Sequence, residues 1–184
     1  MKPTEVLKEE HKAIKLVLRI VEKICTGIES GKPANVEHLE KIVEFIKVFA
    51  DTCHHGKEED LLFPAMEAAG IPRQGGPIGV MLEEHTLGRN YVKNMRTAVE
   101  EYKNGNAAAS KTFITNARNY NALLSQHIDK EDNILYQIAD MHIPEDEQEK
   151  LLKEFERVEV EKIGVGKHEE FHELLKQLKK VYLE

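Results

Sequence analysis

The sequence contains no tryptophan, two cysteines among 184 residues, and no long apolar run. Cys25 and Cys53 form no CxxC pair, which argues against a disulfide framework and favours a reducing cytoplasm. No segment approaches the ~18–20 apolar residues that cross a bilayer, and the first residues lack a signal-peptide core. Basic residues are also too few for a nucleic-acid or anionic-membrane partner, because 33 Asp and Glu outnumber 26 Lys and Arg. We therefore expect a cytoplasmic protein that binds neither nucleic acid nor membrane.

Glycine and proline are gathered in a few short clusters, and between these clusters apolar residues recur every three or four positions. This is the period of an amphipathic α-helix, and no alternating strand pattern competes with it. We predict helices over residues 3–28, 35–66, 77–104 and 107–140. Short connections between long helices favour antiparallel neighbours.

The fold class expected from this pattern is all-α, an up-down antiparallel four-helix bundle with additional C-terminal helices packed on it. The length suits a single domain over residues 1–184, with the bundle core over 3–140. The extension over 144–183 is read as two helical pieces, broken at Gly164 and Gly166, that pack back on the bundle.

Nine histidines are present, and several belong to an internal repeat. Glu9-Glu10-His11 recurs as Glu83-Glu84-His85, and His54-x-x-x-Glu58 recurs as His127-x-x-x-Glu131. Each half is thus predicted to be one helical hairpin, and residues four apart share a helix face. Two such hairpins facing each other would bring six side chains into the bundle interior. These six are His11, His54, Glu58, His85, His127 and Glu131.

The inward-facing carboxylates point to a metal centre. Glu131 falls in the middle of an apolar helical stripe, where a charge is costly unless it is paired or bound to metal. Four imidazoles and two carboxylates without thiolates argue against a structural zinc site. They fit two ions that share bridging carboxylates, ~3.5–4 Å apart. This donor set suits iron, with zinc or manganese as possible occupants.

The second helix offers two registers, because His55 and Glu59 have the same spacing as His54 and Glu58. The repeat and the helical wheel favour His54 with Glu58. Gly56 can disturb the helix here, so His55 and Glu59 stay as reserve ligands or as residues that support the ligands.

The order of these motifs resembles the hemerythrin HHE cation-binding family over residues 4–140, including the Leu61-Leu62-Phe63-Pro64 and Ile134-Leu135-Tyr136 runs that follow the two His-x-x-x-Glu motifs. The resemblance implies a non-haem di-iron centre, cycling between Fe2+ and Fe3+, that binds dioxygen, nitric oxide or a related small ligand. The four histidines would be terminal ligands and the two glutamates bridging ones.

The sequence departs from the oxygen carriers of this family. They carry an extra histidine one turn from the third-helix ligand, where Met81 and Arg89 flank His85, and their last carboxylate is an Asp five residues after its His rather than Glu131 at four. The pattern is closer to members linked to iron sensing, nitric-oxide response and iron–sulfur repair. We hypothesise that His168 or His172 supplies the missing imidazole by closing over one end of the site; the alternative is that both support the ligands or pack on the bundle.

Three functions remain open at this point. The first is a di-iron sensor, store or scavenger of a diatomic ligand, served by a redox partner protein, in which Tyr120 or Tyr136 donates a hydrogen bond to the ligand. The second is a di-iron oxidoreductase acting on peroxide or nitric oxide, with acid–base help from His55, Glu59 or Glu10. The third is an iron-dependent structural or interaction module. His38 and His142 are interpreted as a surface and a loop histidine.

Overall fold

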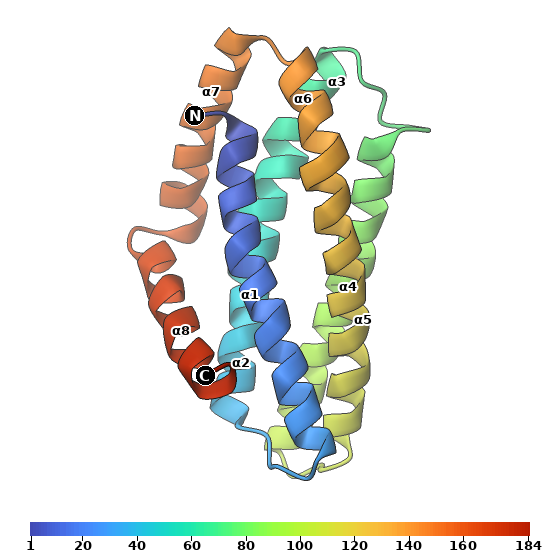
Figure 1. The fold of residues 1–184 in the computed structure, drawn as a ribbon, viewed down its shortest axis with the longest axis vertical. Helices are drawn as coiled ribbons and strands as arrows, with labels where there is room; N and C mark the ends of the chain where they lie inside the picture. Colours follow the sequence, from blue (N-terminus) through green and yellow to red (C-terminus); the bar gives the residue numbers. More distant parts are fainter.

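The computed structural model describes all 184 residues, and it is helical with no strands. Four antiparallel helical rods form the bundle shown in Figure 1. The first and third rods are α1 (Pro3–Glu29) and α4 (Pro77–Lys103). The second rod is the continuous run of α2 (Val36–Phe45), η1 (Ile46–His55), η2 (Glu58–Leu62) and α3 (Phe63–Ala68). The fourth is α5 (Ala109–Lys130), η3 (Glu131–Leu135) and α6 (Tyr136–His142). The all-α four-helix bundle predicted from the sequence is confirmed.

Local sequence explains where the rods begin and end. Pro77 is the first residue of α4, where its missing N–H costs no helical hydrogen bond. The Asn35 side chain caps α2 by accepting from the backbone N–H of His38 at 3.1 Å.

No helix combines the length and apolarity that a bilayer span needs. Both cysteines are buried free thiols.

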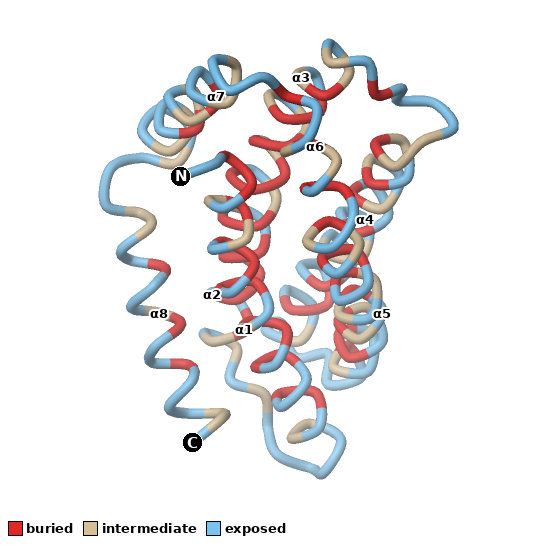
Figure 2. The backbone as a smooth tube through the Cα atoms, turned by 45° about the horizontal axis from the view of Figure 1, so that its top comes forward, coloured by how far each residue is buried: buried red, intermediate tan, exposed pale blue.

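The buried residues lie on the inner faces of the rods, as Figure 2 shows, and they form two separate apolar clusters. The larger cluster includes Ile14, Phe49, Met95 and Ile128. The smaller one begins at Leu7 and takes in α3, α6 and the start of α4. On every rod the predicted ligands lie where the larger cluster gives way to the smaller one, and on the fourth rod Ile128 of the larger cluster stands between His127 and Glu131. A polar layer is therefore held between two apolar ones, where water has little access.

Two further helices, α7 (Glu145–Val158) and α8 (Lys167–Tyr182), lie alongside α1 and the second rod (Figure 1). They are joined by η4 (Glu159–Ile163) and a turn in which Gly164 and Gly166 have φ of 100° and 83°, a region that favours glycine. Phe171 of α8 packs edge-on against Phe45, with ring centroids 5.3 Å apart.

The sequence pattern did not indicate that π-helical turns interrupt the second and fourth rods. The backbone N–H of Gly56 bonds to the carbonyl of Asp51, five residues back, and that of Tyr136 bonds to Glu131 in the same way. Such turns are wider than α-helical ones and are frequent at functional sites. They occur here at the predicted ligands of both hairpins, and the wider turn at the end of η1 accompanies the burial of two consecutive histidines, His54 and His55.

We expect Phe171→Ala to lower the free energy of unfolding by about 3–5 kcal/mol, because it leaves a cavity between α8 and the bundle. The exposed neighbour provides the control, since His172→Ala should change stability by no more than about 0.5 kcal/mol. Urea denaturation followed by circular dichroism measures both. Equal, small effects would show that α8 does not pack on the bundle in solution.

Candidate metal centre

The six residues predicted as ligands come together at one level of the bundle. Each of them is at most 2% exposed. His11 comes from α1, His54 and Glu58 from the second rod, His85 from α4, and the last two from the fourth rod, at the junction of α5 and η3. The two hairpins thus converge on a single interior site, as the repeat predicts.

Glu131 joins histidines from three rods. Its Oε1 lies 2.8 Å from Nε2 of His127 and 3.9 Å from Nε2 of His85. Its Oε2 lies 3.2 Å from Nε2 of His11. Although burial acts to raise the pKa of Glu131, the surrounding imidazoles hold it well below its usual range. The group is therefore a carboxylate available to cations on both of its oxygens.

Glu58 makes the complementary set of contacts. Its Oε2 lies 3.3 Å from Nε2 of His85 and 3.9 Å from Nε2 of His54. Its Oε1 accepts a 2.6 Å hydrogen bond from the hydroxyl of Tyr136, which also lies 3.4 Å from Nε2 of His11. Each glutamate therefore faces histidines of both hairpins.

A fifth imidazole, His55, also belongs to the site. Its ring stacks on His85 with centroids 3.9 Å apart, and the residue is 5% exposed. Burial, together with the neighbouring imidazoles, lowers the pKa of His55 well below its usual value, so the ring is neutral and able to bind a cation. The second rod thus contributes both histidines of its His54-His55 pair, although the repeat favoured only the first.

The histidines and the predicted bridging glutamates fall into two groups whose ligand atoms lie within 4.8 Å of one another, and Glu10, Cys53 and Glu159 form a third group beside them. The first group contains His55, Glu58, His85 and His127, and the second contains His11, His54 and Glu131. Glu59 belongs to none of these groups. It is paired with Arg89, and its Oε2 lies 3.5 Å from Nδ1 of His85.

A shell of carboxylates orients the histidine rings. Where Nδ1 donates to a carboxylate, Nε2 is left as a lone pair pointing inward, an arrangement typical of metal-bound histidine. The close pairs are His11 with Asp132 at 2.7 Å, His54 with Glu10 at 2.7 Å, and His127 with Glu84 at 2.8 Å. These contacts assign Nδ1 of each ring as the atom that donates to the carboxylate and Nε2 as the atom that faces the interior.

Two lysines complete this outer layer. Lys57 donates to Glu10 and to Glu159 of η4, and Lys130 donates to Glu84. The sequence reasoning missed these lysines, although the signal was present. Lys57-Glu58-Glu59 and Lys130-Glu131-Asp132 occupy equivalent places in the two repeats. The repeat therefore covers the residues that orient the ligands as well as the ligands.

Several buried polar atoms at the centre of the site make no hydrogen bond within the protein, although the oxygens of Glu131 lie within ion-pair distance of imidazoles. They are Nε2 of His54, Oε2 of Glu58, Nδ1 of His85 and both oxygens of Glu131. Unsatisfied buried groups of this kind are rare and costly. Cations bound between them would satisfy the inward-facing atoms, and a set of imidazoles and carboxylates without thiolate suits iron. The residues present therefore fit a metal pair.

Other residues singled out from the sequence lie elsewhere. His168 is half-buried against Phe49, with its Nδ1 3.4 Å from Glu159, and His172 is exposed. Neither belongs to the donor groups, so the structure gives no support to the idea that one of them closes the site, and the additional imidazole comes from His55 instead. His38 bonds to Tyr182 at 2.6 Å, and His142 is exposed at the end of α6 rather than in a loop.

Fold and site together define a helical-bundle protein with a histidine- and carboxylate-rich metal centre. A comparison with protein families agrees, since residues 2–139 match the model of the hemerythrin HHE cation binding domain. The match covers well over half of the chain, so the chain belongs to this family. No curated protein and no solved structure gives a significant match.

The two repeated lysines make a matched test of the outer layer. Lys57→Ala should lower the free energy of unfolding by about 3–5 kcal/mol, because it leaves Glu10 buried without its cation. Lys130→Ala removes the same contact at a site where the lysine is partly exposed, and should cost about 1 kcal/mol or less. Urea midpoints of both variants measure the difference, and similar values for the two lysines would contradict it.

The metal-free chain should lose stability as pH rises from about 6.5 through 9. Burial alone would lower the pKa of the buried histidines, but carboxylates raise that of His11 to about 9, that of His127 to about 9 and that of His85 to about 11. A raised folded-state pKa gives stability that is complete below the unfolded value and is lost through the folded value.

Urea midpoints of chelator-treated protein between pH 6 and 10 test this dependence. With metal bound, the stability of the protein should instead rise with pH around neutrality. Metal binding requires deprotonated imidazoles and therefore strengthens as pH rises. A chelated protein that grows more stable between pH 6.5 and 9 would contradict the assignment of carboxylate–imidazole pairs.

Proposed function

We propose that this protein holds two iron ions between its four helical rods and binds a small ligand such as dioxygen or nitric oxide there, as a sensor, store or scavenger. The observation that carries the proposal is the convergence of buried histidines and two buried glutamates, several of whose ring and carboxylate atoms make no hydrogen bond within the protein. Membership of a cation-binding family supports it. Zinc and manganese are alternative occupants of the same donors.

Each of the predicted ligands would offer particular atoms to the ions. His11, His54, His85 and His127 would each offer Nε2, and Glu58 and Glu131, which lie between the hairpins, would each offer oxygens to both ions. His55 is positioned to add a fifth imidazole to the group that contains His85. When bound, ferrous iron supplies electrons and an exchangeable position for a diatomic ligand.

The residues around the site limit the access of water to a bound ligand and supply a hydrogen-bond donor. The apolar clusters above and below the site limit the approach of water along the bundle axis. Tyr136 holds Glu58 through its hydroxyl, and burial raises its pKa well above the usual value, so the phenol stays protonated. It is thus a fixed hydrogen-bond donor at the centre of the site.

Binding is favoured over acid–base catalysis because two of the three candidate bases, Glu10 and Glu59, are already engaged, and the third, His55, belongs to a donor group. Glu10 accepts from His54 and Lys57. Glu59 is paired with Arg89 beside His85. Both carboxylates are held as orienting groups, which leaves neither free to move a proton to or from a substrate.

The test is anaerobic purification, followed by iron counting and optical spectra with dioxygen, nitric oxide and azide. We expect two irons per chain and new near-ultraviolet absorption on exposure to air. His127→Ala should lower the iron content to one or fewer per chain, whereas His142→Ala, at an exposed position, should leave it unchanged.

Three results would contradict the proposal. One is a protein that carries no iron under these conditions, or only zinc. Another is sustained turnover of peroxide beyond two electrons per site, which would show an oxidoreductase. The third is an iron-dependent rise in melting temperature without any spectral response to the three ligands, which would show a structural or interaction module.

A further inference from the structure

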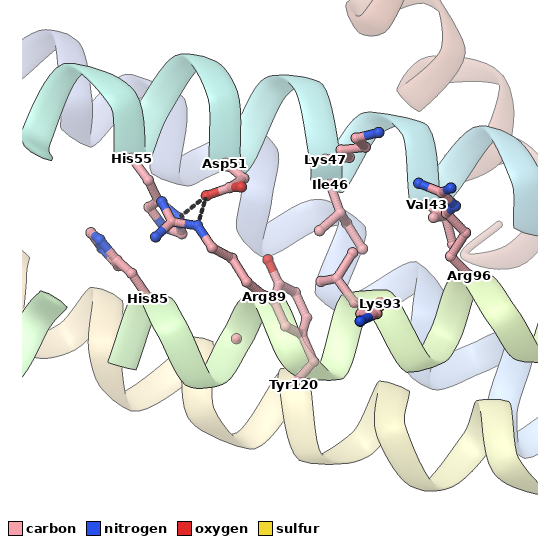
Figure 3. Close-up of a pocket in the computed structure, with 12 residues that line it drawn as sticks. Val43, Ile46, Lys47, Asp51, His55, His85, Arg89, Lys93, Arg96 and Tyr120 are labelled. Atoms are coloured by element: carbon pink, nitrogen blue, oxygen red, sulfur yellow. Dashed lines mark hydrogen bonds and ion pairs between the residues drawn. The ribbon is translucent and has the colours of Figure 1, made fainter. Parts of the chain in front are cut away.

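A pocket opens from the surface between the second rod and α4 and ends at two of the imidazoles. Figure 3 shows His55 and His85 at one end of this pocket and Arg96 at the other. Its volume is about 250 Å³, whereas one water needs only roughly 15 Å³ of such space. A diatomic ligand would leave most of the pocket empty.

The internal repeat shows why the pocket exists on this side of the bundle. Three of its lining residues, Asp51, His55 and Gly88, stand where the other hairpin has Leu124, Ile128 and Ile14. Those three apolar residues are all buried in the larger cluster. The face between α1 and the fourth rod is thus filled with hydrocarbon at the positions where the face between the second rod and α4 is hollow and polar.

The pocket is strongly basic. Lys47, Arg89, Lys93 and Arg96 line it, against a single carboxylate, Asp51. Asp51 is already paired with Arg89 at 2.8 Å, and Arg96 lies 3.8 Å from the exposed Glu100, whereas neither Lys47 nor Lys93 forms an ion pair. An anion would therefore find uncompensated positive charge at the mouth of the pocket.

A hydroxyl group also lines the pocket. Tyr120 is 2% exposed, and its hydroxyl makes no hydrogen bond within the protein. In Figure 3 the side chain rises from the fourth rod toward Arg89 and Ile46, midway between the two ends. Burial raises the pKa of Tyr120, so the phenol stays protonated and can donate. Val43, Ile46 and Val92 add an apolar wall nearby.

We propose that this pocket binds a small organic carboxylate beside the metal centre. Its carboxylate is held by the lysines and Arg96, its apolar body rests on Val43, Ile46 and Val92, and a polar atom of the ligand accepts from Tyr120. This pocket would serve the same metal centre as the proposed function. It rests on that function in one respect, because the end of the ligand nearest His55 and His85 would lie beside bound iron.

Calorimetric titration of the iron-loaded protein with benzoate tests the proposal. Gly88→Ile places in the pocket the residue that the other hairpin has, and should weaken benzoate binding by on the order of tenfold or more. Tyr120→Phe removes one hydrogen bond and should weaken binding by about fivefold for a ligand that uses it, so 4-hydroxybenzoate is titrated as well.

Matched controls separate the pocket from the metal centre. Tyr102→Phe removes a hydroxyl outside the pocket and should leave benzoate affinity unchanged. Benzyl alcohol, which is neutral and of similar size, should bind at least about tenfold more weakly than benzoate if the basic mouth selects the charge. Iron counting on each variant reports the proposed function independently, and titration of the zinc-loaded protein reports binding without iron chemistry.

The proposal is overturned if benzoate binds the wild type and Gly88→Ile equally, or binds neither while both carry iron. Inorganic phosphate that binds as tightly as benzoate would reveal a general anion site instead. If iron is absent and the zinc-loaded protein still binds benzoate in a Gly88-dependent way, the pocket stands and the proposed iron function fails.

Discussion

The structure depends on one electrostatic constraint, which is that imidazole Nε2 atoms and two carboxylates meet inside the bundle, between two apolar clusters. Nε2 of His85 lies only 3.1 Å from Nε2 of His127. A carboxylate lies behind each ring, Glu84 at 2.8 Å from Nδ1 of His127 and Glu59 at 3.5 Å from Nδ1 of His85, so both Nε2 atoms face the interior rather than solvent. Cations bound between the two glutamates would bind these Nε2 atoms and carboxylates. The apolar clusters above and below hold the rods that carry the ligands in place.

The same constraint explains why the two hairpins are alike in more than their ligands. A buried Nε2 donor needs an orienting carboxylate, and a buried carboxylate needs a cation of its own. Glu10 with Lys57 meets both needs in one half, and Glu84 with Lys130 does so in the other. The departures from symmetry, at Asp51, His55 and Gly88, all fall on one side, where they open a pocket that leads to the metal centre.

Sequence periodicity was sufficient to predict the four rods and the six residues that converge, because both follow from helical spacing and from the offset of the repeat. It could not show the π-helical turns, which depend on tertiary packing, and so it left His55 in reserve although the ring is buried against His85. The C-terminal helices were expected on the bundle. His168 and His172 of α8 lie outside the donor groups. Helical spacing predicts which face of α8 they share but not how far that face lies from the donors.

The central claim is tested most directly by the anomalous diffraction of iron-loaded crystals at the iron absorption edge. Two peaks should lie within the polar layer, between Glu58 and Glu131 and beside the imidazoles of both hairpins. A single peak, peaks outside this layer, or histidine rings turned away from the interior would contradict the claim that the two hairpins converge on a shared pair of cations.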